Sequence, residues 1–299
     1  MAKLNIKNSL LLILAALIWG VAFVAQKDGA QLGSFTFNGV RSFLGGFVLI
    51  PVILLLGKKK PVEKKSDDKK GLLIGGICCG IMLFIASSLQ QIGLSFSDTD
   101  AGKAGFITAL YMVFVPIFSI FLGKKLNLRI VISVVVAVLG MYFLCINDSF
   151  SISKGDILIL LCAIFFTGHI LVIDHFVAKH DGVKLSCIQF FTCGVLSLIP
   201  MFVFEDPNFS NILSAWLPLC YTGIMSSGVA YTLQIVGQKD MNPTVASILL
   251  SLESVFAVLA GMILLGETML PREIFGCILM FIAIILTQLP SKKEAGLNG

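Results

Sequence analysis

The stretch ASILLSLESVFAVLAGMILLG, residues 246–266, contains one ionisable side chain, that of Glu253. If this stretch crosses a bilayer as a helix, Glu253 lies ~15 Å from either end, at the midplane. An ionised side chain there costs at least ~2.5 kcal/mol, so such residues usually face the interior of a helix bundle or a watery cavity. Low-dielectric surroundings also disfavour the charged form of a carboxyl group, which suits a side chain that takes up and releases protons. We therefore predict that Glu253 binds substrate or protons; the alternative is a neutral group that only ties two helices together.

Arg41, Lys103 and His169 are further polar side chains within apolar runs. Arg41 could bind an anionic group, although its long stem also allows the guanidinium to reach the membrane surface, and a structural ion pair is a third alternative. Lys103 either lines the outer end of a cavity or extends to the surface in the same way. His169 lies near the middle of its run, where an imidazole can relay protons. All three are therefore candidate ligands of a substrate or an ion.

Amide side chains occupy matching places in two of the apolar runs, because Gln90 and Gln91 in one correspond to Gln234 in the other. Such amides often form hydrogen bonds between membrane helices without binding a ligand. Their repetition at equivalent positions favours the lining of a cavity.

Aromatic side chains in the same runs could form stacking walls for an organic substrate, and ordinary core packing is the alternative for each. The four candidates are Trp19, Phe106, Tyr111 and Tyr231.

The elements that position these side chains are membrane helices. The mean hydropathy is +0.97, 57% of the 299 residues are hydrophobic and 13% are charged, whereas soluble domains carry roughly a quarter charged residues. Apolar runs of about 20 residues, the length that crosses a bilayer, recur along the chain. We expect an all-α membrane protein with ten transmembrane helices, near residues 8–26, 35–56, 71–95, 100–122, 128–146, 155–176, 183–203, 213–237, 243–266 and 271–289.

Lysine and arginine residues gather in alternate loops, including seven lysines between residues 57 and 70. Cytoplasmic loops of membrane proteins are enriched in these residues. We therefore predict a multi-pass protein of the cell membrane, in bacterial terms the inner membrane, with both termini cytoplasmic. The net charge of +5 does not indicate a nucleic-acid partner, because the lysines lie next to the spans.

Motifs of enzymes and of cofactor sites are missing from the sequence. The eight cysteines lie in apolar runs without a CxxC pair, which is typical of small buried side chains, and HExxH, Walker A and GxSxG patterns are absent. We predict neither an enzyme nor an ATP-driven pump, and expect neither a metal nor a cofactor.

The two halves of the sequence resemble each other at offsets of about 145 residues. LQQIGL, residues 89–94, matches LQIVGQ, residues 233–238, and FVLIP ending at Pro51 matches LSLIP ending at Pro200. Five spans in each half is an odd number, so the second half must be inverted in the membrane. We expect two five-helix domains, residues 1–147 and 148–299, an arrangement typical of secondary transporters.

Three segments carry a resemblance to the EamA-type permeases of the drug/metabolite transporter superfamily over essentially the whole chain. They are IWGVAFVAQK, SSLQQIGLSFSDTDAGKAGFITALYMVFVPIFS and NPTVASILLSLESVFAVLAGMILLGET. Where such permeases often have proline after the glutamate of the third segment, this chain has Ser254. The resemblance implies that the first, third, fourth, sixth, eighth and ninth spans surround a central cavity, and that the fifth and tenth are peripheral.

A carboxyl group at the midplane, combined with cationic and amide groups nearer the outside, suits a zwitterionic solute. We expect export of amino acids or related small metabolites across the bilayer, coupled to protons. The alternatives are efflux of lipophilic cations, with Glu253 as the exchangeable anion, and a membrane receptor or structural subunit that moves nothing. A homodimer is compatible with the sequence.

Overall fold

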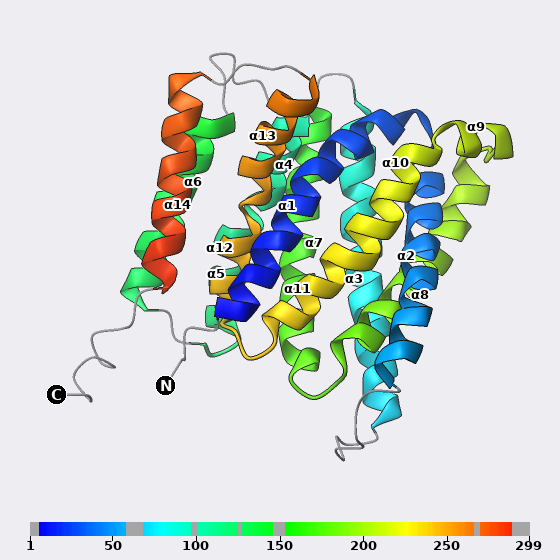
Figure 1. The fold of residues 1–299 in the computed structure, drawn as a ribbon, viewed down its shortest axis with the longest axis horizontal. Coiled ribbons are helices and arrows are strands. Elements are labelled where there is room, and N and C mark those ends of the chain that lie inside the picture. The colour runs from blue at the N-terminus through cyan, green and yellow to red at the C-terminus, as the bar shows by residue number, and fades with distance from the viewer. Residues whose placement is uncertain are drawn as a thin grey trace.

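The computed structural model describes residues 6–57, 68–96, 101–124, 127–145, 153–265 and 270–288. The five lysines from residue 58 to residue 65 and both chain ends, on which the predicted orientation depends, lie outside these ranges. The described residues are helical, joined by short turns (Figure 1).

Residues 6–145 contain α1 (Ile6–Asp28), η1 (Gly29–Gln31), α2 (Ser34–Gly57), α3 (Lys69–Ser95), α4 (Ala101–Ala109), α5 (Tyr111–Phe121) and α6 (Leu128–Cys145). Residues 154–288 contain α7 (Lys154–Val177), α8 (Gly182–Phe204), α9 (Phe209–Ser214), α10 (Trp216–Cys220), η2 (Tyr221–Ala230), α11 (Tyr231–Gln238), α12 (Pro243–Leu250), α13 (Glu253–Leu265) and α14 (Pro271–Gln288). Each of the ten apolar runs expected from the sequence is helical, with bounds within a few residues of those predicted.

Seven of these runs are long and apolar enough to cross a membrane, judged on the described residues. They are α1, α2, α3, α4 with α5, α7, α8, and α12 with α13. The fifth run is a shorter apolar helix, Leu128–Phe143. The eighth is divided into several short pieces, α9 to α11, and α14 begins with a polar turn. The chain is therefore an all-helical membrane protein with seven clear spans.

Two of the runs that were expected to be single helices are interrupted near their middle. In the fourth, the backbone N–H of Val113 donates to the carbonyl of Leu110 at 2.8 Å, a bond over three residues that tightens the helix between α4 and α5. In the ninth, the N–H of Ser254 donates to the carbonyl of Ser251 at 3.2 Å, between α12 and α13. Such short tightened turns inside helices often mark functional positions.

The eighth run contains a different irregularity. Its central segment η2 is a π-helix, Tyr221–Ala230, which is wider than an α-helix and is found frequently at functional sites. The three irregular segments lie in the fourth, eighth and ninth runs, all of which the resemblance assigns to the cavity.

The helices α2 and α8 pack side by side and run antiparallel. A Cβ atom added to Gly39, early in α2, would lie 3.4 Å from Ser197, late in α8, and one added to Gly46 would lie 3.1 Å from the ring of Phe191, earlier in α8. These two helices carry the matching FVLIP and LSLIP segments of the two halves.

The helices α6 and α14, the last of each half, also pack antiparallel. The rings of Phe143 and Phe275 lie 5.3 Å apart, and a Cβ atom added to Gly140 would lie 2.9 Å from the backbone nitrogen of Met280. In Figure 1 this pair lies at the left edge of the molecule, whereas α2 and α8 lie toward the right, with α1, α7 and α11 between the two pairs and α9 at the right edge.

Candidate functional site

A cavity lies among the central helices, with about 450 Å³ of space between its lining atoms, including the part that opens to solvent. Its lining residues come from the first, second, third, fourth, sixth, eighth and ninth runs: Trp19, Phe23, Gln26, Arg41, Gln90, Thr108, Tyr111, Phe166, Ile170, Ser226, Tyr231, Gln234, Leu250 and Glu253. The six runs implied by the resemblance all contribute, and α2 adds Arg41.

Glu253 is the first residue of α13 and lines the cavity at the interruption of the ninth run. Its side chain is 4% exposed, and its Oε1 has no hydrogen-bond partner among the described residues. The ninth run is long and apolar enough to be one span, as predicted, but the tight turn at Ser251 interrupts its helix and separates α12 from α13. This turn places the carboxyl group at the N-terminus of a half-helix, which carries a partial positive charge that favours an anion.

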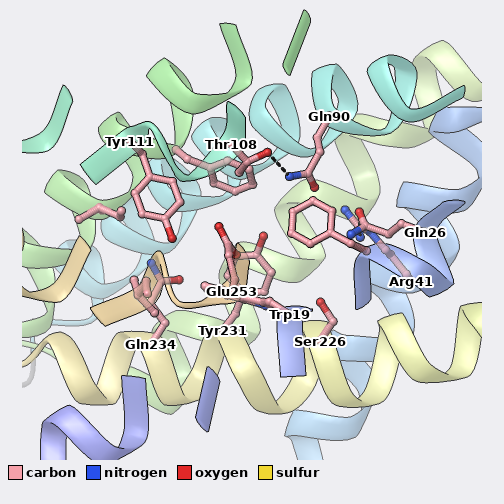
Figure 2. A pocket seen from close by; sticks show the side chains of 14 residues that line it. Trp19, Gln26, Arg41, Gln90, Thr108, Tyr111, Ser226, Tyr231, Gln234 and Glu253 are labelled. Atoms are coloured by element: carbon pink, nitrogen blue, oxygen red, sulfur yellow. Dashed lines mark hydrogen bonds between the residues drawn. The ribbon is translucent and has the colours of Figure 1, made fainter. Parts of the chain in front are cut away.

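Tyr111 occupies the corresponding place in the fourth run, as the first residue of α5 after the turn at Leu110. Its hydroxyl points toward the carboxyl group of Glu253 (Figure 2). Among the described residues this hydroxyl has no hydrogen-bond partner. The two interruptions therefore bring a phenol and a carboxyl group to face each other across the cavity.

Arg41 is buried, with 5% of its surface exposed. Its Nη1 donates to Oε1 of Gln26 at 2.9 Å, and its guanidinium carbon lies 5.6 Å from the centre of the Phe37 ring, within the reach of a cation–π contact. The proposed extension to the membrane surface is wrong, because the side chain lines the cavity. The proposed ion pair is wrong as well, since no acidic residue within the described ranges contacts Arg41.

Trp19 and Tyr231 form the aromatic wall of the cavity, with ring centroids 4.7 Å apart. The indole Nε1 of Trp19 has no acceptor among the residues that the structure describes. Phe166 and Phe23 complete the apolar lining. Phe106, which was predicted to join this wall, is instead half-buried against the hydrophobic core and does not line the cavity.

Two of the three predicted glutamines line the cavity. Gln90 donates from Nε2 to Oγ1 of Thr108 at 3.0 Å, and Gln234 presents an Oε1 atom without a partner in the described part of the chain. Gln91 lies outside the lining, and its Nε2 donates to the backbone carbonyl of Gln26 at 3.1 Å.

His169 and Lys103 do not line the cavity. His169 is fully buried behind Tyr231, with ring centroids 5.9 Å apart, and its Nε2 lies 3.0 Å from Oε1 of Gln189. Lys103 forms an ion pair with Asp156, 2.5 Å between Nζ and Oδ2. From the sequence we expected Lys103 to line the outer end of the cavity or to reach the surface. Its partner Asp156 was not foreseen, because it lies far away in the sequence.

Sequence reasoning missed Gln26, Thr108 and Ser226 as lining residues. Gln26 lies within the quoted segment IWGVAFVAQK, where an amide among apolar residues was an available signal. Thr108 and Ser226 gave no comparable signal, because hydroxyl side chains are common in membrane helices, where they bond to the backbone of their own helix. No group of three or more His, Cys, Asp or Glu that could hold a metal ion is found within the described ranges.

An all-helical membrane protein with a central cavity lined by a few polar and several aromatic side chains has the architecture of a solute transporter. Residues 6–146 and 153–289 each match the EamA-like transporter family. The chain belongs to this family, and is therefore a membrane transporter and not an enzyme.

Relatives match along nearly the whole chain. An uncharacterized transporter of Archaeoglobus fulgidus is 35% identical over 280 residues, covering 93% of this chain and 84% of its own. The uncharacterized inner membrane transporter YedA of Escherichia coli K12 is 23% identical over 276 residues, 91% of this chain and 88% of its own. A protein of known crystal structure superimposes with a TM-score of 0.77 at 18% identity, over 94% of this chain and 96% of that one, which shows the same fold.

Proposed function

We propose that the protein is a secondary transporter that exports a small zwitterionic metabolite, amino acids above all, with protons as the coupling ion. The observation that carries this proposal is the carboxyl group of Glu253, buried in a cavity that also contains the guanidinium of Arg41. Neither charge has an opposite charge as a partner among the described residues. A solute with an ammonium and a carboxylate group would satisfy both.

Transport in this proposal proceeds by alternating access of two inverted five-helix halves, residues 1–147 and 148–299, with ten spans in total. The antiparallel pairs α2 with α8 and α6 with α14 support the inversion, because each pair joins counterparts of the two halves. The matched glutamines Gln90 and Gln234 both line the cavity, as expected for a site on the axis that relates such halves.

Coupling arises from competition at Glu253. The ionised carboxylate binds the ammonium group of the substrate, and a proton that arrives from the other side of the membrane displaces it. Because the site is buried, the empty carboxylate is costly in free energy, so the side chain exchanges one cation for the other instead of remaining bare.

The test is Glu253→Gln, measured on one reconstituted sample by counterflow and by gradient-driven flux. Glutamine has nearly the same shape and lowers the cost of membrane insertion, so the variant should fold. At saturating substrate it should retain counterflow, and it should lose its dependence on the pH gradient. Glu253→Asp should keep the coupling with weaker affinity, because the carboxylate is withdrawn by one methylene group.

The matched control is Glu273→Gln, the same chemical change at a residue that caps the start of α14 outside the cavity. It should leave both fluxes unchanged. Gradient-driven transport by Glu253→Gln at the wild-type rate would show that the carboxyl group is only a tie between helices. Proton coupling would then have to be sought at His169.

Efflux of lipophilic cations is the second candidate, and the rings of Trp19 and Tyr231 beside Glu253 favour it. The guanidinium of Arg41 in the same cavity repels a cation, which is why a zwitterion ranks first. Uptake of tetraphenylphosphonium into the same proteoliposomes separates the two: transport of this cation, unaffected by amino acids, would favour the second candidate.

A further inference from the structure

The cavity has two ends of different chemistry. Figure 2 shows Arg41 and Gln26 at one end and Tyr111 and Gln234 at the other, with Glu253 between them. The structure therefore separates the side chain that can bind an anion from the side chain that can bind a cation.

The position of Arg41 within the cavity depends on Gln26. Arg41 carries several N–H donors, and among the described residues its hydrogen bond from Nη1 to Oε1 of Gln26 is the one that fixes the guanidinium. A neutral amide orients a guanidinium without neutralising its charge. A carboxylate in the same place would form a bidentate ion pair and occupy the N–H groups that could otherwise bind an anionic ligand.

The backbone at Gln26 is itself anchored to α3. Gln91 donates from Nε2 to the carbonyl of Gln26, and the neighbouring Lys27 donates from Nζ to the carbonyls of Leu94 and Phe96 at 2.9 and 3.0 Å. These bonds join the end of α1 to the end of α3. The amide of Gln26 is therefore held at a defined position, from which it aims the guanidinium on α2.

We propose that Arg41 binds the carboxylate of the substrate and that Gln26 is the positioning residue that holds Arg41 charged, unpaired and directed into the cavity. This inference rests on the proposed function and assigns one end of its site. Glu253, at a distance from this end, then serves the ammonium group alone.

The test uses matched probes in which one charged group is removed at a time. L-phenylalanine, phenethylamine and 3-phenylpropionate share one side chain and carry both charges, the ammonium alone and the carboxylate alone; L-leucine, 3-methylbutylamine and 4-methylpentanoate form a second series. Their binding to the purified full-length protein is measured from the ligand dependence of its thermal unfolding temperature.

Gln26→Ala should weaken both amino acids and both carboxylates by about tenfold, because a hydrogen bond to a charged group is lost. The two amines should change less than twofold. Gln26→Glu is the more specific variant: it preserves size and an acceptor for Arg41, so the fold is retained, but it neutralises the guanidinium and should weaken the same four probes. A purely structural role of Gln26 predicts no such selectivity.

Gln238→Ala is the control, since Gln238 is a buried amide that also joins two helices, through a bond of 3.2 Å to the carbonyl of Ile170, yet lies outside the lining. Its loss should lower the unfolding temperature without changing the ranking of the probes. Wild-type carboxylate affinity in Gln26→Ala or Gln26→Glu would overturn the positioning role.

The two proposals fail in different ways. Suppose that the two carboxylates bind the wild type but the amino acids do not, and that Arg41→Ala abolishes the carboxylate binding. This result would contradict the proposal of a zwitterionic substrate and support an anion site at Arg41. If neither carboxylates nor inorganic phosphate bind in an Arg41-dependent manner, the anion site is overturned.

Discussion

A guanidinium without an acidic partner is the least expected side chain of this cavity. Snorkelling of Arg41 would have made lysine an acceptable replacement, because both stems reach the surface. Arg41 is instead buried in the lining of the cavity. We therefore expect lysine to be a poor replacement. Lysine presents a compact charge without the planar fork that can bond to Gln26 and to a carboxylate at once.

Arg41→Lys should therefore lower the affinity for amino acids by about tenfold while expression and the unfolding temperature stay near those of the wild type. The measurement is substrate counterflow as a function of concentration, which separates affinity from maximal rate. Arg129→Lys, at the start of α6 outside the cavity, is the matched control. Undiminished affinity in Arg41→Lys would mean that a charge alone is sufficient.

The sequence located the residues of the site better than their orientation. Glu253, Tyr111, Trp19 and Tyr231 were predicted and lie in the lining, because isolated polar or aromatic side chains in apolar runs are visible in a linear pattern. For Lys103 the pattern failed, since its partner Asp156 is 53 residues away and charge pairs across helices leave no local signal.

The helices themselves were predictable, because an apolar run of about 20 residues has few alternatives in a membrane. Their interruptions were not. Neither Leu110 nor Ser251 is a glycine or a proline, the residues that mark bends in a sequence. The turns at these positions depend on packing against neighbouring helices. The wider segment η2 contains Gly223 and Gly228 and follows Pro218, but these residues indicate an irregular helix without specifying a π-helix.

Close packing at Gly20 fixes the half-helix that carries Glu253. A Cβ atom added to Gly20 would lie 2.5 Å from Cβ of Phe256 and 2.7 Å from the backbone nitrogen of Ala257, both on α13. Backbone cannot yield as a flexible side chain can, so Gly20→Ala should push α13 away from α1. Since Phe256 lies one turn after Glu253, the carboxyl group moves with it.

Gly20→Ala should lower stability by about 1–3 kcal/mol, the usual cost of overpacking, and should reduce gradient-driven transport more than it reduces the amount of folded protein. Thermal unfolding and flux per folded molecule measure the two effects. Gly105→Ala is the control, because its nearest neighbour would be 3.6 Å from the new atom, an ordinary contact. Equal transport in both variants would show that α13 tolerates displacement.

At the scale of the whole molecule, the two halves are similar but not equivalent. The fourth run is joined to α7 by two ion pairs, Lys103 with Asp156 and Lys124 with Asp174, one near each end. The corresponding contact in the other half, between the ninth run and α1, is made through Gly20 and apolar side chains. One interface between the halves is therefore held by charge and the other by close packing.

Orientation in the membrane is testable with single cysteines in a background from which the eight natural cysteines are removed. If the termini are cytoplasmic, an impermeant thiol reagent should label Asn208→Cys in intact cells and Lys64→Cys only after permeabilisation, because the lysine-rich loop is then inside. Two cysteine substitutions at Lys3 and Lys292 serve as markers for the termini. Labelling of both loops from outside would contradict the inverted arrangement.

Similarity between the halves also bears on the direction of net transport. If the inward-open and outward-open shapes arise by exchanging the roles of two similar halves, their free energies are close, and each step of the cycle is readily reversed. Differences such as the two lysine–aspartate pairs shift the resting balance without blocking the backward path. Whether such a molecule works as an exporter or an importer is then decided by the concentrations of solute and protons on its two sides.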